Sequence, residues 1–255
     1  MPTADPAPAP VPARRRGWIA VRAVTLALGV AAFALLLASG PATRSGLWDW
    51  RTGLRVFAGA ATVGMIAAAA AVVLLAIGFV PRWRSRPWVP LVALCLGLAA
   101  MAPPLIFRAQ ASHVPPIHDI TTDAQDPPAF MALLAERDHS PNGSAYAGAQ
   151  VFDQQRAAYP DIKPAVLPGA PRDTMQRAID AARSLGWEVV ASDAAAGRIE
   201  ATDRTRWFGF SDDIVVRVRP EGAGSRVDVR SASRVGRSDV GANARRVRKF
   251  LAKLA

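Results

Sequence analysis

The sequence contains a single cysteine, Cys95, and only three histidines among its 255 residues. One cysteine excludes a disulfide within the chain and any zinc site built from several thiolates. The motifs of a nucleophile elbow, a P-loop and a dinucleotide-binding turn are also missing. We therefore expect no catalytic residue that a motif would identify, no metal ligand set and no cofactor.

Acidic residues, lysine and histidine are missing from three long apolar runs, 18–39, 56–80 and 88–107. A membrane-crossing helix needs about 20 apolar residues, so each run predicts one span. A cleaved signal peptide is the alternative for the first run, but its length and the two following runs favour a span. Transport paths usually need titratable groups at depth, so we predict an anchor of three transmembrane helices. Residues 1–17 are rich in Pro and Ala or basic, and we expect them to be disordered and cytoplasmic.

Arginine is unevenly distributed around these runs. Residues 1–107 hold ten Arg against two Asp, which is +8 of the total net charge of +11. Three arginines each lie in 14–16 and in the loop 82–86, and the positive-inside rule places both segments in the cytoplasm. We therefore expect an integral, multi-pass protein of a bacterial inner membrane whose chain after residue 107 is periplasmic. This charge pattern indicates a lipid bilayer as partner, and no nucleic acid is expected.

Small residues and prolines mark the second and third runs. Ala60, Gly64 and Ala68 recur every four residues, a spacing that lets helices approach closely, although alanine-rich composition alone would also produce it. Pro103 and Pro104 lie near the end of the third run. We expect them to end or kink that helix.

The second half divides into a connecting segment and a folded domain. Residues 108–168 contain many Pro, Asp and Gly and predict an extended arm. In 169–255, apolar periodicity predicts a helix over 171–186 and a last helix that begins near Asp239. Alternation predicts strands at 187–192, 198–203, 212–220 and 225–231. Short connections make this an α+β domain, an antiparallel four-stranded sheet with two helices on one face.

Residues 113–254 resemble a known family. TRWFGFSDDIVVRV, followed by VDVRSASRVGRSDVGANARR, is similar to the domain of unknown function 1499 family. HDITTD, DPPAF and AYPDI resemble its membrane-anchored branch. Shorter members carry cysteines around a Pro-Asn step, but SPNGS at 140–144 has none, so no disulfide or lipid anchor is implied there. The resemblance implies the extent of the domain and no activity.

Spaced Arg, Asp, Ser and Asn residues near the ends of the last two strands form the first candidate site. Asp213 begins one strand and Arg230 ends the next, so a hairpin would bring them together. Arginine forks bind carboxylates and phosphates, which indicates an anion or lipid-headgroup pocket. The alternative is a structural Arg–Asp network that fixes the strand-to-helix connection. The candidate ligand-binding residues are Asp212, Asp213, Arg230, Ser231, Ser233, Arg234, Asp239, Asn243 and Arg246.

A second candidate motif is Thr121, Thr122 and Asp123, within a stretch that also holds all three histidines. Histidine and carboxylate side chains can bind a metal, but no ligand spacing such as HExxH is present. We expect this stretch to be a turn-rich connector in which Thr and Asp side chains cap backbone donors. The basic residues of 234–253 are interpreted as the solvated face of the last helix, with contact to anionic lipid as the alternative.

These features together favour a binding or accessory module over an enzyme. We expect a membrane-anchored envelope protein that handles an anionic small molecule, a lipid or an envelope protein partner. An envelope hydrolase that uses Asp212 or Asp213 as its base is the alternative. If the second half were cytoplasmic, its basic last helix would favour a nucleic-acid-contacting module instead.

Overall fold

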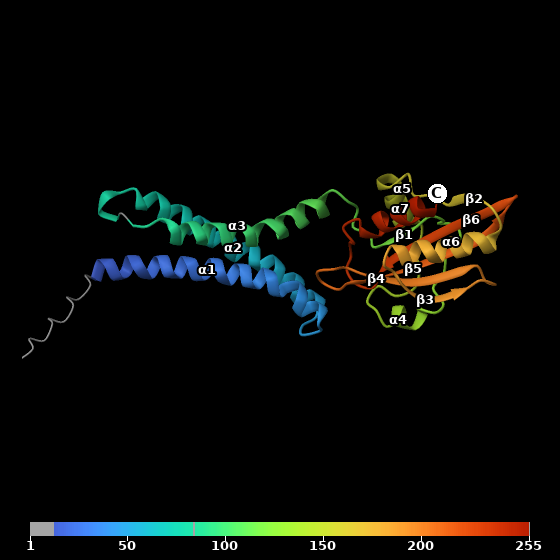
Figure 1. The fold of residues 1–255 in the computed structure, drawn as a ribbon, viewed down its shortest axis with the longest axis horizontal. Coiled ribbons are helices and arrows are strands. Elements are labelled where there is room, and N and C mark those ends of the chain that lie inside the picture. Colours follow the sequence, from blue (N-terminus) through green and yellow to red (C-terminus); the bar gives the residue numbers. More distant parts are fainter. Residues whose placement is uncertain (1–12, 84, 255) are drawn as a thin grey trace, which may run out of the picture. The chain divides into compact units, whose positions relative to one another are not determined.

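The computed structural model describes residues 13–83 and 85–254 (Figure 1). The chain divides into two compact units, one that ends at Phe107 and one that begins at Arg108. This boundary is where the sequence changes from apolar to polar.

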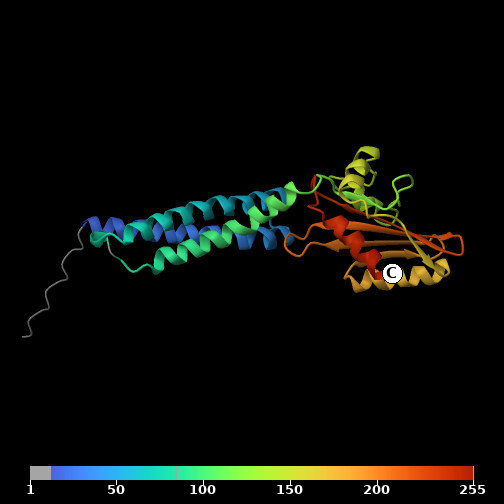
Figure 2. The same ribbon diagram turned by 90° about the horizontal axis from the view of Figure 1, so that it is seen from above.

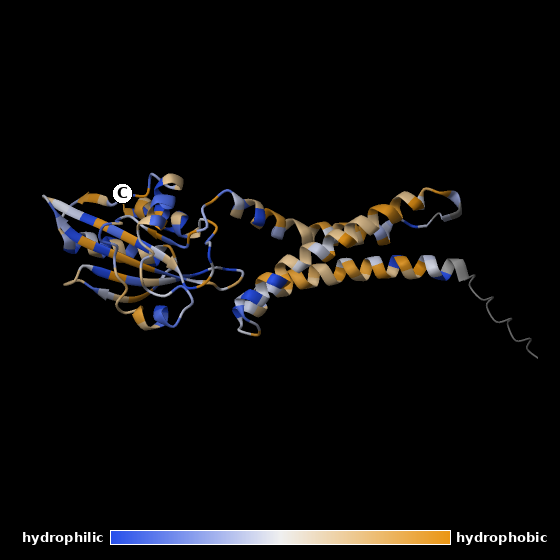
Figure 3. Cartoon of the chain, turned by 180° about the vertical axis from the view of Figure 1, so that it is seen from behind, coloured by the Kyte–Doolittle hydropathy of each residue, from blue (hydrophilic) through white to orange (hydrophobic). Residues whose placement is uncertain are grey.

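The first unit contains the helices α1 (Ala13–Arg44) and α2 (Trp50–Gly78), a 3-10 turn at Pro81–Trp83, and α3 (Trp88–Ser112) up to Phe107. All three helices are long and apolar enough to cross a membrane, as predicted, and Figure 3 shows their apolar colouring.

Both ends of this unit differ from the expectations. The helix α1 already includes residues 13–17, so the predicted disorder is wrong there, since arginine is a good helix former. Residues 1–12 lie outside the described part of the chain. The helix α3 continues through Pro103 and Pro104 to Ser112, so the prolines do not end it. Proline is tolerated inside an apolar span because groups of the neighbouring helices can satisfy the backbone carbonyls that lose their hydrogen bonds.

The helices α2 and α3 touch at two glycines. A Cβ atom placed on Gly64 would lie 2.6 Å from the carbonyl oxygen of Gly97, and one placed on Gly97 would lie 2.6 Å from that of Gly64. Nothing larger than hydrogen fits at either position without moving a backbone. The spacing of small residues therefore does mark a close helix contact.

The second unit contains a six-stranded antiparallel sheet with the order β1-β6-β5-β4-β3, and β2 also pairs with β6. The strands are β1 (Asp119–Thr121), β2 (Ala165–Pro168), β3 (Glu188–Asp193), β4 (Arg198–Arg204), β5 (Ser211–Glu221) and β6 (Gly224–Ser233). The four predicted strands are all present, but a sheet of only four is wrong.

The two additional strands come from the segment that was expected to be an extended arm. Without them β6 would be a sheet edge with unpaired backbone groups, and β1 and β2 pair with its two halves. The same segment also contains the short helices α4 (Leu134–Asp138) and α5 (Ala149–Ala158). Residues 119–168 are therefore an integral part of the fold, not a linker to it.

One face of the sheet is apolar and is covered by α6 (Pro171–Ser184) and α7 (Ala242–Leu254), as Figure 2 shows. The prediction of two helices on one face is confirmed. Alternating residues of β5 and β6 supply the core on this side, and Trp187 stacks on Phe250 at 5.1 Å between ring centroids. Gly186, with φ of +81°, ends the helical segment as expected, and Trp187 N donates to Ala182 O.

The other face of the sheet is largely ionic. Residues 122–146 cover it with only a small apolar cluster, in which Phe130 and Leu133 meet Val215 and Ala232. The buried Glu200 carboxylate of β4 accepts hydrogen bonds from the backbone N–H groups of residues 131–133 at 2.9, 3.0 and 2.9 Å. These bonds fix the segment just before α4 on the sheet.

Candidate functional site

The nine candidate residues do not form one cluster, because the sheet separates them. Successive side chains of a strand point to opposite faces, so Asp212 and Asp213 cannot share a site. Asp212, Ser231, Ser233, Asp239, Asn243 and Arg246 lie on the side of α7, whereas Asp213, Arg230 and Arg234 lie on the side of residues 122–146. The prediction of a single cluster is therefore wrong.

Arg246 is the centre of the network on the α7 side. Its guanidinium donates to Asp212 Oδ2 at 2.7 Å, Asp203 Oδ2 at 2.9 Å and Asn243 Oδ1 at 2.5 Å. It also donates to Ser231 Oγ at 3.2 Å. Two carboxylates and two neutral oxygens thus hold one guanidinium in a fixed orientation.

Asn243 connects this network to the strands. Ser231 Oγ donates to Asn243 Oδ1 at 2.7 Å, so the side-chain amide of Asn243 holds the hydroxyl of Ser231. Asn243 Nδ2 donates to His118 O and to Ser233 Oγ, both at 3.0 Å. These bonds attach α7 to β6 and to the residue before β1, which favours the interpretation of a structural network.

Asp239 caps backbone donors just before and within the first turn of α7, near where the sequence predicts the helix to begin. Its carboxylate accepts hydrogen bonds from the backbone of Gly241 at 2.7 Å and of Asn243 at 2.9 Å. Burial raises the pKa of Asp239, although these two donors act in the opposite direction. Val240, between the cap and the helix, has a φ of +52°, which is rare and strained for a β-branched residue.

Asp213 holds the network on the opposite face and is fully buried. Its carboxylate accepts hydrogen bonds from Arg234 at 2.8 and 2.9 Å, from Arg137 at 3.1 Å and from Thr202 Oγ1 at 2.8 Å. The bond to Asp213 raises the pKa of Arg234, while burial lowers that of Arg137. Both remain far above neutrality in any folded protein, so two positive charges surround this carboxylate.

Arg230 pairs with Asp119 by two hydrogen bonds of 3.0 and 2.7 Å, and both side chains are buried. The guanidinium carbon of Arg230 lies 4.9 Å from the ring centroid of Phe130 and 5.4 Å from that of Tyr146. The guanidinium of Arg137 also contacts Phe130, at 4.4 Å. The guanidinium of Arg230 therefore binds the carboxylate of Asp119 in its own chain, whereas the sequence predicted that it would bind a ligand.

The second candidate motif also has internal partners. Thr122 Oγ1 accepts from Val229 N at 2.8 Å, and Asp123 Oδ1 accepts from the backbone N–H groups of residues 125 and 126, both at 3.1 Å. The expectation that these side chains cap backbone donors is confirmed. Thr121 Oγ1 donates to Asp123 O at 3.0 Å.

A further ion-pair group links the same segment to the sheet. The remaining Asp123 oxygen, Oδ2, faces three arginines of β5 and β6, which also contact Asp228 or Asp126. The members are Asp123, Asp126, Asp228, Arg217, Arg219 and Arg226. Among residues 13–83 and 85–254, no three His, Cys, Asp or Glu side chains converge as a metal site would require.

Sequence reasoning missed Arg137, Asp119, Asp228 and Glu200 as members of these networks. All four are buried charged residues. Glu200 and Asp228 each alternate with apolar neighbours along their strands, and this alternation was the available signal of the sheet face on which they lie. Arg137 had no such signal, because α4 is only five residues long.

The arrangement argues against acid–base chemistry at Asp212 or Asp213. A general base must reach a substrate proton, whereas both carboxylates are buried and accept hydrogen bonds from arginine. The geometry favours the structural reading for most of the nine candidate residues.

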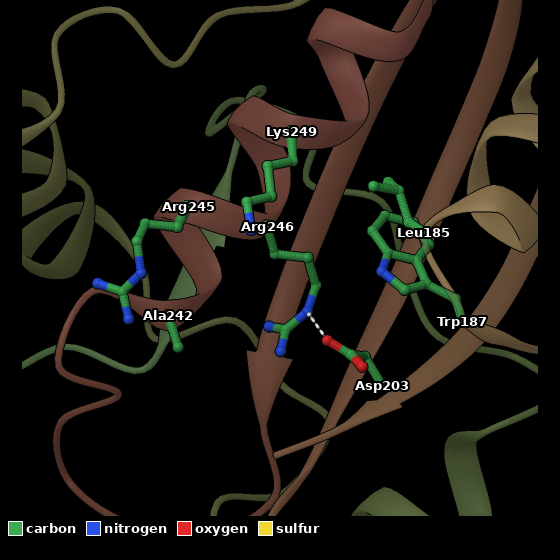
Figure 4. Close-up of a pocket in the computed structure, with 7 residues that line it drawn as sticks. All are labelled: Leu185, Trp187, Asp203, Ala242, Arg245, Arg246 and Lys249. Carbon is green, nitrogen blue, oxygen red and sulfur yellow. Dashed lines mark hydrogen bonds and ion pairs between the residues drawn. The ribbon is translucent and has the colours of Figure 1, made fainter. Parts of the chain in front are cut away.

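A pocket with a volume of about 200 Å³ lies beside the α7 network. Figure 4 shows its lining, which consists of Leu185, Trp187, Asp203, Ala242, Arg245, Arg246 and Lys249. Three of these residues are basic and one is acidic. Arg245 is exposed and donates one bond to Val240 O at 2.9 Å, and Lys249 is also exposed. The pocket thus combines an apolar wall with a positive rim.

The comparisons with known proteins agree with the resemblance seen in the sequence. No curated protein matches the chain. A family profile described as "Protein of unknown function (DUF1499)" matches residues 119–254, which is more than half of the 255 residues. The match begins at the first residue of β1 and ends at the last residue of α7, so it covers the whole sheet domain. The chain therefore belongs to the DUF1499 family of proteins of unknown function.

Proposed function

We propose that this protein is a membrane-anchored binding module, and that its sheet domain holds a small anionic ligand in the pocket beside α7. The arginine distribution supports an orientation with the N-terminus in the cytoplasm and the sheet domain on the outer side of a bacterial inner membrane. The three apolar helices support the anchor.

The observation that carries the proposal is the lining of the pocket. Arg246 is already engaged by four acceptors, so it shapes the base of the pocket and has little capacity left for a ligand. Arg245 and Lys249 are exposed at one side, on successive turns of α7. Two flexible bases at that spacing suit one carboxylate or phosphate group.

The opposite wall determines what else the ligand carries. The ring of Trp187 is fixed by its stacking on Phe250, and Leu185 continues the apolar surface. A volume of about 200 Å³ admits a small group only. The ligand supported best is therefore a small anion with a short apolar part, which the pocket binds without converting it.

Titration of the full chain in nanodiscs of neutral lipid tests this function. Inorganic phosphate, hexanoate and butyl phosphate are added separately, and heat release and thermal unfolding are recorded. We expect saturable binding that is strongest for butyl phosphate, because it satisfies both walls of the pocket. Saturation by none of the three probes would overturn the proposal.

A matched pair of variants assigns the site. Replacement of both pocket bases, Arg245→Gln with Lys249→Gln, should abolish the binding. The control Lys253→Gln removes an exposed charge from the same helix, one turn beyond the pocket, and should leave binding unchanged. Equal losses in both proteins would show that only the charge of the helix matters.

A further inference from the structure

The loop between β4 and β5, residues 205–210, gathers three aromatic side chains in the sequence TRWFGF. We call it the aromatic loop. Trp207 is 41% exposed, although it is one of the largest apolar side chains of the chain. The function proposed above does not use this loop, because the pocket is lined by other residues.

The aromatic loop is a fixed structure. Thr205 N donates to Phe210 O at 2.9 Å, Gly209 N donates to Thr205 O at 3.0 Å, and Phe210 N donates to Thr205 Oγ1 at 2.9 Å. The rings of Phe208 and Phe210 stack with centroids 5.1 Å apart and planes 6° from parallel. Two stacked aromatic rings thus support the loop, and Trp207 keeps 41% of its surface exposed. A rigid exposed tryptophan loses little conformational entropy when it binds a surface.

The loop lies at the end of the sheet from which the chain leads back to the apolar helices. Register places Arg204 opposite Ser211, and both Asp213 and Asp119 opposite Ala232. The aromatic loop and the first residue of β1 therefore share one end of the sheet, which we call the tethered end. Only residues 113–118 separate Ser112, the last residue of α3, from Asp119. This segment can extend over at most about 25 Å.

The same end is also basic. Arg204 and Arg206 precede Trp207 in the sequence, and Arg237 lies in the connection that leaves β6 at this end; all three are exposed. One exposed acid, Glu188, lies 3.7 Å from Arg204. An exposed tryptophan among arginines is typical of surfaces that enter the headgroup layer of an anionic bilayer, where the indole ring and the phosphate groups both find partners.

We propose that the aromatic loop docks on the anionic phospholipid surface of the membrane that anchors this chain, with Trp207 at the depth of the headgroups and Arg204, Arg206 and Arg237 against phosphates. The short connection keeps the tethered end within reach of that surface. Docking adds a second attachment to the covalent anchor and limits rotation of the sheet domain. Because the connection is short, the effective concentration of the membrane surface at the aromatic loop is high, so even a weak contact is occupied most of the time.

The test uses tryptophan fluorescence of the full chain in nanodiscs made of lipids brominated close to the headgroup. The signal of Trp207 is obtained as the difference between the unaltered chain and the Trp207→Phe variant. We expect bromolipids to reduce this difference signal about twofold, because a docked indole lies at the depth of the bromines. Aqueous iodide should have little effect on it.

A control places a tryptophan at the opposite end of the sheet. Ala223→Trp, combined with Trp207→Phe, adds an exposed indole in the turn between β5 and β6. Its signal should be quenched by iodide and insensitive to bromolipids. A Trp207 signal that behaves like this control would overturn the proposal.

A second set of variants tests whether the arginines attract the aromatic loop to the lipid phosphates. Arg204→Gln, Arg206→Gln and Arg237→Gln are combined, and bromolipid quenching of Trp207 is compared in anionic and neutral nanodiscs. Docking on phosphates predicts weaker quenching after the substitutions and stronger dependence on salt in the unaltered chain. Quenching that is unchanged by charge and salt would refute the assigned role of the arginines. Circular dichroism confirms folding of each variant.

Discussion

Replacement of Asp213 by asparagine tests whether the buried ion pairs hold the sheet domain together. The carboxylate is fully buried and accepts four hydrogen bonds from Arg137, Arg234 and Thr202. An amide supplies one acceptor oxygen and no charge, so two guanidinium groups lose their counter-ion. The loss of one partner of a buried pair costs about 3 to 5 kcal/mol. A domain is stable by only about 5 to 15 kcal/mol, so the effect is large.

The expected loss corresponds to a fall in melting temperature of about 10 °C, at about 2 to 4 °C per kcal/mol for a domain of this size. The assay is urea unfolding of the full chain in nanodiscs, read by a short protease pulse that digests only unfolded sheet domain. The fraction that survives gives the free energy of unfolding of that domain, without interference from the apolar helices.

Asp161→Asn is the matched control, because Asp161 also holds an arginine, Arg248, by two bonds of 2.6 Å. Asp161 is exposed and Arg248 is half-buried, so water screens the pair and its loss should cost less than about 1 kcal/mol. Equal losses of stability for the two variants would refute the argument from burial. An Asp213→Asn protein as stable as the unaltered chain would return Asp213 to the list of candidate functional residues.

Three further predictions use other parts of the chain. Val240→Gly should stabilise the sheet domain by about 1 kcal/mol in the same assay, because glycine relieves the strain of a positive φ; a destabilised variant would contradict this. Burial raises the pKa of Tyr146 to about 12. A Tyr159→Phe chain, in which Tyr146 is the remaining tyrosine, should therefore show no tyrosinate absorbance at 295 nm below about pH 11, and a titration midpoint near 10 would be the opposing result. The stability of the sheet domain should fall as pH rises from about 10 through 12, since only the folded state retains the proton of Tyr146 over this range. In a cysteine-free chain, a cysteine at residue 144 should react with an impermeant thiol reagent in intact cells, and one at residue 85 only after lysis; the reverse pattern would place the sheet domain in the cytoplasm.

Periodicity in the sequence was sufficient to predict the four longer strands, and it also contained the information on their faces, which the prediction of a single cluster did not use. The strand of residues 212–220 was predicted from the alternation of Ile214 and Val216 with polar neighbours, and β5 confirms it. The same alternation places Asp212 and Asp213 on opposite faces, so the error of a single cluster could have been avoided from the sequence alone. The hairpin argument considered only which strand ends meet.

The contribution of residues 108–168 could not be predicted in the same way. Its strands have three and four residues, too few for a periodic signal. Asp119 and Arg230 are 111 residues apart in the sequence, and nothing local in either segment specifies the other. A segment rich in Pro, Asp and Gly resembles a linker in sequence. Its role in the fold becomes clear only when the arginines of the sheet that pair with its aspartates are known.

The pairing of β1 with β6 has a consequence for the synthesis of this protein. The first strand of the sheet domain finds its partner only when residues 230–232 have been made, after nearly all of the domain. Until then Asp119 and its neighbours have no place to bind, and the entropy of closing so long a loop opposes early contact. We expect the domain to remain open during synthesis and to close in one late step, as folds with distant contacts do. Under the orientation proposed above, the sheet domain crosses a membrane before it folds, and this delay keeps the chain open while it crosses.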